Sequence, residues 1–494
     1  MRRWSKKMTA TLQKSPFVLV LACTVIGITG CVAIPPDQDV LPRQDMTKVQ
    51  LAADIKLARD GWPQAQWWTQ YGDPQLDNLI GHALADSPDL KAAAARIGAA
   101  QAVLTINKAS EGIGAGFNAG VNRQRYSGNG LFPPPIGGNA FTDESLQLQA
   151  RYDFDWWGKR RSQIAAVLGE TNARRADYAQ AEQTLAAVIA QTYFNLQSGW
   201  ARLANLRKMA ALQHDLLMDQ IKRVAHGLGS IDDQHLAEAH LSELKEQIAQ
   251  LDAQTIHERE ALRALVGADS NAFADLKPVA APGLSHAMPS KLGVELLARR
   301  PDLQAARWRV EASLDRTEVA KAAFYPDINL TGSFGLDAMS LNRLFEADSR
   351  TFLVGPVLSL PLFNSKALQG RLDAARNERN ELIADYNQSV LNAVCEVAQA
   401  GAALQGIETQ LRQQADVMAS TGAMLRAAQS RFKHGLADHA KMLHAEMAAL
   451  QQRDIDLQLQ HQRLLAEVAL TKALGGGYRA GTPETQTTLA HSLN

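Results

Sequence analysis

The sequence predicts a mainly α-helical protein with four β-strands, built as two tandem copies of one unit. Sequence motifs recur in the same order at offsets of about 210 residues, which indicates an internal duplication. Each half also holds a proline-free stretch of about 70 residues that is rich in helix-forming residues. Two short segments in each half alternate apolar and polar residues, a period that is typical of β-strands.

The composition excludes several classes of protein. The 494 residues include 51 Lys and Arg against 51 Asp and Glu. The chain therefore lacks the surplus of basic residues that would indicate a nucleic-acid partner. Aromatic residues make up 6%, and Ala, Leu, Gln, Glu and Arg recur, a balance that favours long helices over an α/β enzyme. No glycine-rich phosphate loop or nucleophile elbow is visible, and we therefore expect no enzymatic activity.

Residues 1–30 have the pattern of a lipoprotein signal peptide. Basic residues precede an apolar run from Phe17 to Ile28, which is shorter than the roughly 20 residues of a membrane-spanning helix. The run ends in Ile-Thr-Gly followed by Cys31, which resembles the bacterial lipobox, so we expect diacylglyceryl and N-acyl lipid on Cys31. Cys23 is a rival site with a very short apolar run before it, and an ordinary signal peptide is the other alternative. The residue after Cys31 is not Asp, so the usual inner-membrane retention signal is missing and we expect an outer-membrane anchor.

Three pairs of motifs define the two repeats. They are Ser87–Ala93 with Arg300–Ala306, Arg223–Leu228 with Arg431–Leu436, and Ala264–Gly267 with Ala473–Gly476. We place the first repeat at 75–285 and the second at 286–477. An extended segment that carries the lipid, 31–74, precedes them, and a flexible tail, 478–494, follows them.

Each repeat is expected to begin with a helix and to continue with a pair of strands. The predicted helices are Gln75–Ala109 and Lys291–Ala323, and the predicted strands are Ile113–Arg123, Ser145–Asp155, Asp327–Leu336 and Thr351–Leu360. The strands have a period of two and about ten residues, as tilted membrane strands do. Glycine-rich and proline-rich segments connect them and indicate hairpin loops.

A very long helix follows in each repeat and then returns through a tight turn. The long helices are expected at Trp156–Ala225 and Asn364–Lys433, and the return helices at Asp233–Leu265 and His439–Leu474. About 70 helical residues extend roughly 100 Å, far more than a globular domain needs. Gly227 and Gly435 stand where a helix C-cap is wanted. A coiled-coil scaffold is the alternative for these helices taken alone.

The strands, rather than the helices, are the segments expected to cross a membrane. No second apolar stretch reaches the length of a spanning helix, and in lipid only helices and closed barrels satisfy the backbone. Four strands per chain are too few for a barrel, which needs about eight or more. We therefore expect a cyclic oligomer, in which three copies supply about twelve strands.

Five motifs follow one another along the chain in a characteristic order. They are Trp67-Trp68 with Tyr71–Leu76, Tyr152–Lys159, Leu297–Leu303, Ala323–Ile328 and Gly355–Asn364. Together they resemble the outer-membrane-factor (TolC-like) family, in particular its NodT-like lipoprotein branch, which serves resistance-nodulation-division pumps. The resemblance implies a homotrimeric channel with a β-barrel in the outer membrane and long helices in the periplasm.

The resemblance further implies passive conduction of small toxic compounds and no cofactor. An inner-membrane transporter supplies the energy, and a periplasmic adaptor protein docks on the helices. Two other functions remain open from the residues alone. They are the outer-membrane component of a type I protein secretion system and a non-conducting, lipid-anchored coiled-coil scaffold.

The two His-Gly-Leu turns are implied to form the tip that docks on the adaptor. The residues concerned are Arg223, Gly227, Leu228, Arg431, Gly435 and Leu436. A glycine in the turn lets another backbone approach closely, the leucine offers an apolar contact, and the arginines are expected to brace the neighbouring helix. Plain hairpin turns without a partner are the alternative.

A pore gate is implied just after the second turn. The family usually has a Leu-Asp-Ala-Gln-type stretch there, and this chain has Leu443–Glu446 with His444 in place of the aspartate. Threefold symmetry would gather copies of Asp438, Lys441 and His444 near the axis. We expect weaker cation selectivity than usual and, because histidine titrates near neutral pH, a pH-dependent conductance. A solvated helix face is the alternative.

The remaining chemistry-bearing residues give weaker signals. Trp156, Trp157, Phe324 and Tyr325 are expected at the membrane interface, where amphipathic rings gather, with burial between helices as the alternative. Cys395 is expected to be a small packed hydrophobe. The scattered histidines and methionines show no metal-ligand spacing, so we expect no metal site.

Overall fold

The computed structural model describes residues 34–37, 39–45, 55, 62–267, 276–282, 296, 298–361 and 364–479. The predicted signal peptide, the lipidation site Cys31 and all but two residues of the predicted tail lie outside these ranges. The chain divides into two compact units. Unit 1 contains Gly98–Asn172, Trp308–Ala384 and the residues up to Pro42; unit 2 contains Arg43–Ile97, Ala173–Arg307 and the residues from Asp385 onward.

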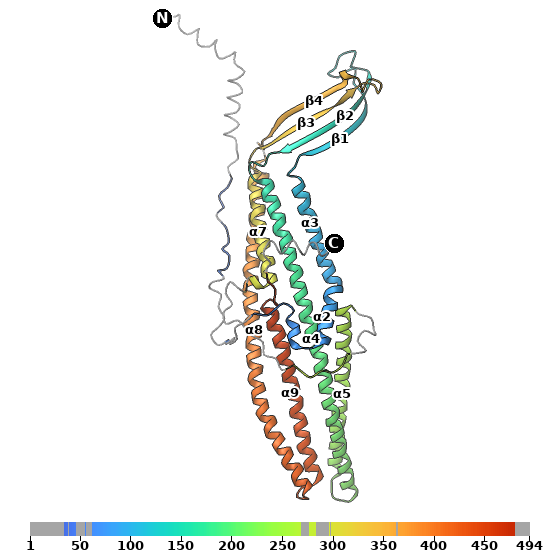
Figure 1. Ribbon diagram of the computed structural model, residues 1–494, viewed down its shortest axis with the longest axis vertical. Coiled ribbons are helices and arrows are strands. Elements are labelled where there is room, and N and C mark those ends of the chain that lie inside the picture. Colours follow the sequence, from blue (N-terminus) through green and yellow to red (C-terminus); the bar gives the residue numbers. More distant parts are fainter. Residues whose placement is uncertain are drawn as a thin grey trace, which may run out of the picture. The chain divides into compact units, whose positions relative to one another are not determined.

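Unit 1 contains one antiparallel sheet of four strands in the order β1-β2-β3-β4 (Figure 1). The strands are β1 (Gly114–Arg125), β2 (Ala140–Asp153), β3 (Asp327–Ala338) and β4 (Arg350–Ser359). All four predicted strands are therefore confirmed. Strand β2 begins at Ala140, earlier than the predicted Ser145, because its pairing with β1 continues to Arg125.

The sheet has one apolar and one mainly polar face. Phe117, Leu148, Phe334 and Phe352 lie opposite one another across the four strands. They are 66%, 54%, 59% and 83% exposed, so none of the described residues covers this row. Successive side chains in a strand point to opposite faces, and the neighbouring row on the other face contains Asn118, Gln147 and Thr351.

The long helices lie close to their predicted positions. They are α4 (Lys159–Ala225), α5 (Ile231–Val266), α8 (Ser365–Lys433) and α9 (His439–Ala473). The shorter helices are α2 (Pro74–Asp86), α3 (Pro88–Ala109) and α7 (Pro301–Ala322). None of the helices in the described ranges is both long enough and apolar enough to span a bilayer.

The prediction of one continuous helix from Gln75 to Ala109 is wrong. Helix α2 ends at Asp86, and α3 begins at Pro88. Proline has no backbone N–H and favours the first turn of a helix. The hydroxyl of Ser87 accepts a hydrogen bond from the backbone N–H of Leu90 at 3.4 Å and caps the new helix.

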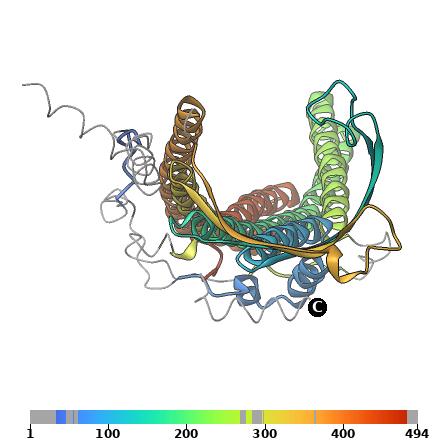
Figure 2. The ribbon, with the colours of Figure 1, turned by 90° about the horizontal axis from the view of Figure 1, so that it is seen from above.

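The four long helices of unit 2 form a row in the order α5-α4-α9-α8. The contacts that define it are Gln213 to the Ala237 carbonyl (α4 to α5, 3.2 Å), Arg202 to Asp454 (α4 to α9, 3.1 Å) and Gln414 to the Gln452 carbonyl (α8 to α9, 3.0 Å). Leucines such as Leu206 and Leu244 pack between the helices in one apolar cluster. Figure 2 shows α5 and α8 at the two ends of this row, with α4 and α9 between them.

The Arg-Arg-Pro-Asp motif at the start of α7 connects three helices within unit 2. Arg300 is 6% exposed; its guanidinium contacts both carboxylate oxygens of Asp302 and donates to Glu396 at 2.7 Å and to the Ala473 carbonyl at 2.9 Å. It thereby ties the C-terminal end of α9 to α7 and α8. At Gly475 a Cβ atom would lie 1.9 Å from the backbone oxygen of the neighbouring Arg299, so only glycine fits this approach.

Candidate functional site: the helix-hairpin tips and the gate segment

The two turns at the helix tips have the same backbone conformation. In the first, the Leu228 N–H donates to the Arg223 carbonyl at 2.8 Å and the Gly227 N–H to the Val224 carbonyl at 2.9 Å. In the second, Leu436 donates to the Arg431 carbonyl at 2.8 Å and Gly435 to the Phe432 carbonyl at 3.0 Å. These paired bonds form a Schellman motif, in which the residue after the helix is left-handed.

Glycine is required at both turns for its backbone conformation. Gly227 has φ +69° and Gly435 has φ +70°, a region that L side chains enter only at an energetic penalty. No atom lies within 4 Å of a Cβ built on either residue, so the turns are open on their outer side. Another backbone therefore has room to approach them.

The leucine after each glycine is the most exposed apolar feature of its turn. Leu228 is 70% exposed and Leu436 is 77% exposed. Burying such a side chain against a partner stabilises the contact by about 1.5–3 kcal/mol. The two arginines were expected to brace the neighbouring helix, but each donates a hydrogen bond within its own hairpin. Arg223 donates to the carbonyl of Leu228, and Arg431 donates to the carbonyl of Ala427.

The return helices begin with side-chain caps at equivalent positions. The Ser230 hydroxyl accepts from the Asp232 N–H at 3.1 Å, and the Asp438 carboxylate accepts from the Lys441 N–H at 2.8 Å. A carboxylate at an N-cap satisfies a free backbone donor and interacts favourably with the helix dipole. Asp438, which the sequence assigns to the gate, thus holds the start of α9.

The other two residues predicted to form the gate share one exposed face of α9. Lys441 and His444 lie one helical turn apart and are both exposed. On a different face of the helix, Leu443 and Met447 are buried in the cluster between α4, α5 and α9. The structure therefore places Lys441 and His444 side by side, on a face of α9 that no other described part of this chain covers.

One contact near the tips was not predicted from the sequence. The Nδ1 atom of His439, the first residue of α9, lies 2.6 Å from a carboxylate oxygen of Asp219 on α4. The ring of Phe432 on α8 lies 5.2 Å from that of His439. His439 thus links the two hairpins through a partner about 220 residues away in the sequence, a separation that no local motif reveals.

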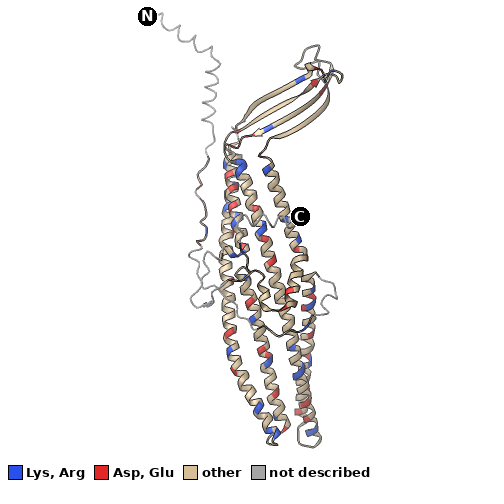
Figure 3. Ribbon diagram, in the orientation of Figure 1, with Lys and Arg blue, Asp and Glu red and all other residues tan. Residues whose placement is uncertain are grey.

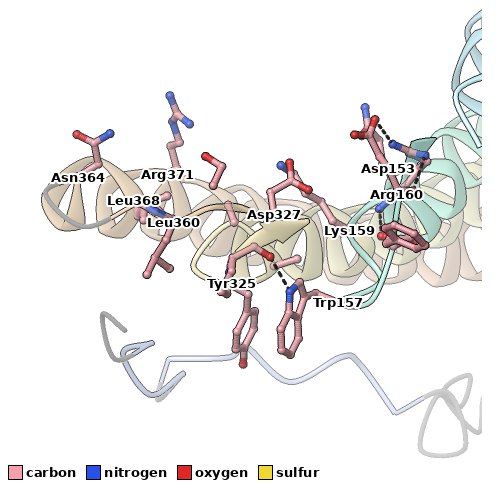
Figure 4. Close-up of a pocket in the computed structure, with 18 of the residues that line it drawn as sticks. Asp153, Trp157, Lys159, Arg160, Tyr325, Asp327, Leu360, Asn364, Leu368 and Arg371 are labelled. Carbon is pink, nitrogen blue, oxygen red and sulfur yellow. Dashed lines mark hydrogen bonds and ion pairs between the residues drawn. The ribbon is translucent and has the colours of Figure 1, made fainter. Parts of the chain in front are cut away.

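A second feature of interest lies in unit 1, where the strands meet the helices. A cavity of about 660 Å³ opens between the end of β2, the start of β3 and the starts of α4 and α8 (Figure 4). Arg160 donates to Asp153 at 3.0 Å, and the Asp155 carboxylate accepts from the backbone N–H groups of Arg160 and Arg161 at 2.9 Å each. These bonds fix the direction in which α4 leaves the sheet.

Aromatic residues surround this junction. Trp157 stacks on Tyr325 with ring centroids 4.5 Å apart and donates to the Pro326 carbonyl at 2.8 Å. Trp156, Trp157 and Tyr325 are 64%, 48% and 40% exposed. Phe324 is buried against Leu368 and Leu372, so the interface position expected for it is wrong and the alternative, burial between helices, is correct.

The comparison with family models decides the identity of the chain. The model described as outer membrane efflux protein matches residues 79–268 and again 292–476. The chain belongs to the outer membrane efflux protein family. The two matched segments correspond to the two halves in which the structure repeats its hairpin of strands and its hairpin of helices. Proteins of this family are outer-membrane efflux channels rather than enzymes.

Named relatives of this efflux channel cover nearly its whole length. It is 38% identical over 482 residues to the multidrug resistance outer membrane protein MdtP of Escherichia coli K12, covering 94% of this chain and 97% of that protein. It is 34% identical over 490 residues to the putative multidrug resistance outer membrane protein MdtQ of Shigella flexneri, covering 95% and 100%. These relatives are outer-membrane proteins.

Solved structures show the same fold. The outer membrane protein VceC of Vibrio cholerae is 29% identical, with a TM-score of 0.76 over 85% of this chain and 100% of that one. The CmeC outer membrane channel of Campylobacter jejuni is 20% identical, with a TM-score of 0.79 over 93% and 97%.

An extended N-terminal segment of the efflux channel lies along α8 in unit 1. Arg379 makes two contacts with the Asp37 carboxylate, and Arg376 donates to the Pro35 carbonyl at 2.6 Å. Hydrogen bonding and charge from Arg379 lower the pKa of Asp37 below its ordinary value. Ile34 packs beside Phe324. The sequence predicted this segment only as an extended, lipid-carrying segment, and its arginine partners could not be read from the sequence.

The described ranges contain no cluster of His, Cys, Asp or Glu suited to a metal ion. His461 illustrates a packed histidine: burial, together with the charge of Arg202, lowers its pKa, and its Nε2 lies 2.8 Å from the Asn195 side-chain oxygen. Cys395 is exposed, so the prediction that it is a packed hydrophobe is wrong.

Proposed function

We propose that this chain forms, as a homotrimer, the exit duct of a tripartite efflux system that carries small toxic compounds across the outer membrane. The observation that carries the proposal is the sheet of unit 1. Its exposed apolar row suits lipid, whereas its other face is mainly polar. The names of the relatives, which refer to multidrug resistance, support small toxic compounds as the cargo.

The edges of the sheet support an oligomer. In the described part of the chain, β1 and β4 each pair with a strand on one side only. Unpaired backbone groups are unfavourable in lipid, where no water replaces the missing partner. Pairing of β4 in one copy with β1 in the next removes both edges, and three copies reach about twelve strands, within the range of membrane barrels.

A lipid on Cys31 is consistent with the place where the N-terminal segment docks. Ile34, three residues later, packs at the junction of strands and helices. Three extended residues reach about 11 Å at most. Acyl chains on Cys31 would therefore enter the bilayer near the exposed rings of Trp157 and Tyr325, a level at which aromatic residues favour the membrane interface.

The two exposed turns are the surface on which we propose that a periplasmic adaptor docks, linking the duct to an inner-membrane transporter. Open glycines and exposed Leu228 and Leu436 support this role. Lys441 and His444 would line the gate near the threefold axis, with Asp438 as the cap that positions them. A His444→Asp variant in bilayer recordings is expected to increase cation selectivity and to reduce the pH response of the conductance; unchanged selectivity and pH response would remove His444 from the gate.

The test is a clean deletion screened against antibiotics, dyes, aromatic acids, solvents and metal salts, with secreted proteins profiled in parallel. We expect hypersensitivity that wild-type protein and an Asn129→Trp control restore, since Asn129 lies in the exposed loop between β1 and β2. A Gly435→Trp variant at the tip should fail to restore resistance. A missing secreted protein with normal sensitivity would instead identify a protein-secretion duct.

A further inference from the structure

The apolar face of the sheet in unit 1 ends in arginines on the side of the loops. Arg123 and Arg125 lie six and eight residues after Phe117 in β1. Arg350 lies two residues before Phe352 in β4. Because successive side chains alternate between the two faces, these even spacings place all three arginines on the face of the exposed apolar row, and all three are exposed. Figure 3 shows the middle of the four described strands without charged residues, which gather toward the strand ends.

These three arginines have no acidic partner among the described residues. None of them takes part there in an ion pair or a side-chain hydrogen bond. By contrast, Arg151 on the other face of β2 pairs with Asp153 at 2.7 Å. Glu144 is the one carboxylate of the four described strands that shares the face of the arginines, and it is buried, with 6% exposure. The three guanidinium groups are therefore available to a ligand from outside the chain.

The length of the strands places the arginines at the outer surface of a bilayer. From Gly114, the first residue of β1, to Arg123 the strand extends about 31 Å. A tilt of about 40° reduces this to roughly 23 Å in height, close to the 25 Å of the apolar band of a membrane barrel. Trp157 and Tyr325 lie at the opposite end of the sheet, where the strands meet the helices. An arginine that faces lipid is costly at the middle of the bilayer and nearly neutral at its surface.

The register of the sheet places the arginines of its two edges on one rim. Arg125 pairs with Ala140 at the start of β2. Arg350 lies, across β3 and β2, opposite Ala119 of β1. The loop ends of β1 and β4 are thus shifted by six residues relative to each other. Tilted strands in a barrel have such a stagger, so Arg125 and Arg350 lie at a similar height on opposite edges of the sheet.

Assembly brings these two edges together. In the proposed homotrimer, β4 of one copy pairs with β1 of the next. A continued stagger of about two residues per strand puts Arg125 of the next copy diagonally beside Arg350, about 8 Å away. Arg123 of that copy lies roughly 7 Å farther along its strand. Each seam between copies then gathers three guanidinium groups at the edge of the exposed apolar face.

We propose that each seam binds a phosphorylated glycolipid of the outer leaflet, of the lipid A class, through Arg350 of one copy and Arg123 and Arg125 of the next. Guanidinium groups form paired, charge-assisted hydrogen bonds with phosphate oxygens. The exposed rings of Phe117 and Phe352 lie below the arginines, where they contact acyl chains. Lipid A combines several acyl chains with a phosphate at each end of its disaccharide, whereas a phospholipid offers a single phosphodiester charge to three cations. The inference rests on the proposed homotrimer.

Lipid titration of the purified full-length protein in detergent tests the site. Native mass spectrometry counts the molecules of lipid A on each trimer, and we expect one for each seam at saturation. Combining Arg123→Gln, Arg125→Gln and Arg350→Gln should weaken the apparent affinity about tenfold or more. The matched control, Arg151→Gln, removes an exposed arginine from the other face of the sheet and should leave the affinity unchanged. Circular dichroism verifies that both variants are folded.

Related ligands then test the chemistry of recognition. Dephosphorylated lipid A should bind about tenfold more weakly, and inorganic phosphate should not displace lipid A, because it has no acyl chains. Equal binding of dephosphorylated lipid A or of phosphatidylglycerol, displacement by phosphate alone, or full affinity in the triple variant overturns this inference. A trimer that conducts in bilayers without any preference for lipid A leaves the proposed duct standing. A monomeric native mass overturns the homotrimer itself.

Discussion

The contact between His439 and Asp219 leads to a quantitative prediction about opening. It joins the first residue of α9 to α4 close to the tips, at 2.6 Å, with side chains that are 43% and 26% exposed. If the gate opens by separation of the two hairpins, removal of this pair favours the open state. We predict that His439→Ala increases the open probability of the duct in planar bilayers.

The size of the effect follows from the exposure of the pair. A solvent-accessible pair of this kind contributes about 0.5–1 kcal/mol. In a homotrimer whose three gates move together, the contributions add to about 1.5–3 kcal/mol. Each 1.4 kcal/mol changes an equilibrium constant tenfold, so the ratio of open to closed states should rise by roughly 10-fold to 100-fold.

Single-channel recording of purified protein measures this ratio directly. His439→Ala, Asp219→Ala and the double variant form a cycle, and the double variant should match the single ones because all three remove the same contact. His240→Ala is the matched control, since His240 is also exposed and contacts only Glu243 of its own helix. A wild-type ratio of open to closed states in both single variants would refute the reasoning, and so would additive effects on this ratio in the double variant.

Three further predictions concern stability. Gly435→Ala should lower the free energy of unfolding by about 1 kcal/mol, measured by thermal unfolding, because a φ of +70° disfavours L residues. The control, Gly422→Ala within α8, should be neutral or stabilising. Equal effects of the two substitutions would argue against the left-handed turn. Gly475→Ala should cost more, about 2–4 kcal/mol, since its Cβ would lie 1.9 Å from the Arg299 carbonyl oxygen; a neutral result would contradict that packing. Asp37→Asn should expose the N-terminal segment to limited proteolysis at neutral pH. In the wild type the pKa of Asp37 is lowered on folding, so its stabilisation is present at neutral pH and is lost only as the pH falls below the ordinary value of 3.8; cleavage of the wild type already at pH 6 would contradict this.

The fold was largely predictable from the sequence because its signals are local. Proline-free helical stretches, alternating strands and glycines after each long helix all act within a few residues. The ends of α4, α5, α8 and α9 consequently differ little from the predicted ones. The break at Ser87 was also visible as Ser-Pro, but helical periodicity on both sides obscured it.

The positions of the two helix-hairpin turns were predictable from the sequence, whereas the contacts around them were only partly so. Gly227 and Gly435 act locally and stand where the sequence places them. The Arg300 network and the contact between His439 and Asp219 depend on partners far apart in the chain, so no spacing rule reveals them. Asp438 differs from these, because its capping role depends on a hydrogen bond from a backbone N–H only three residues away. This role could have been predicted from the local sequence, whereas the family resemblance implied a place in the gate.

Conductance of the purified protein tests the central claim most directly. Full-length protein is inserted into planar bilayers, and single-channel current is recorded for the wild type and for His439→Ala. We predict discrete current steps in the wild type and longer open times in the variant. Stable insertion of folded trimers with no current in either protein would contradict a duct and favour a lipid-anchored scaffold.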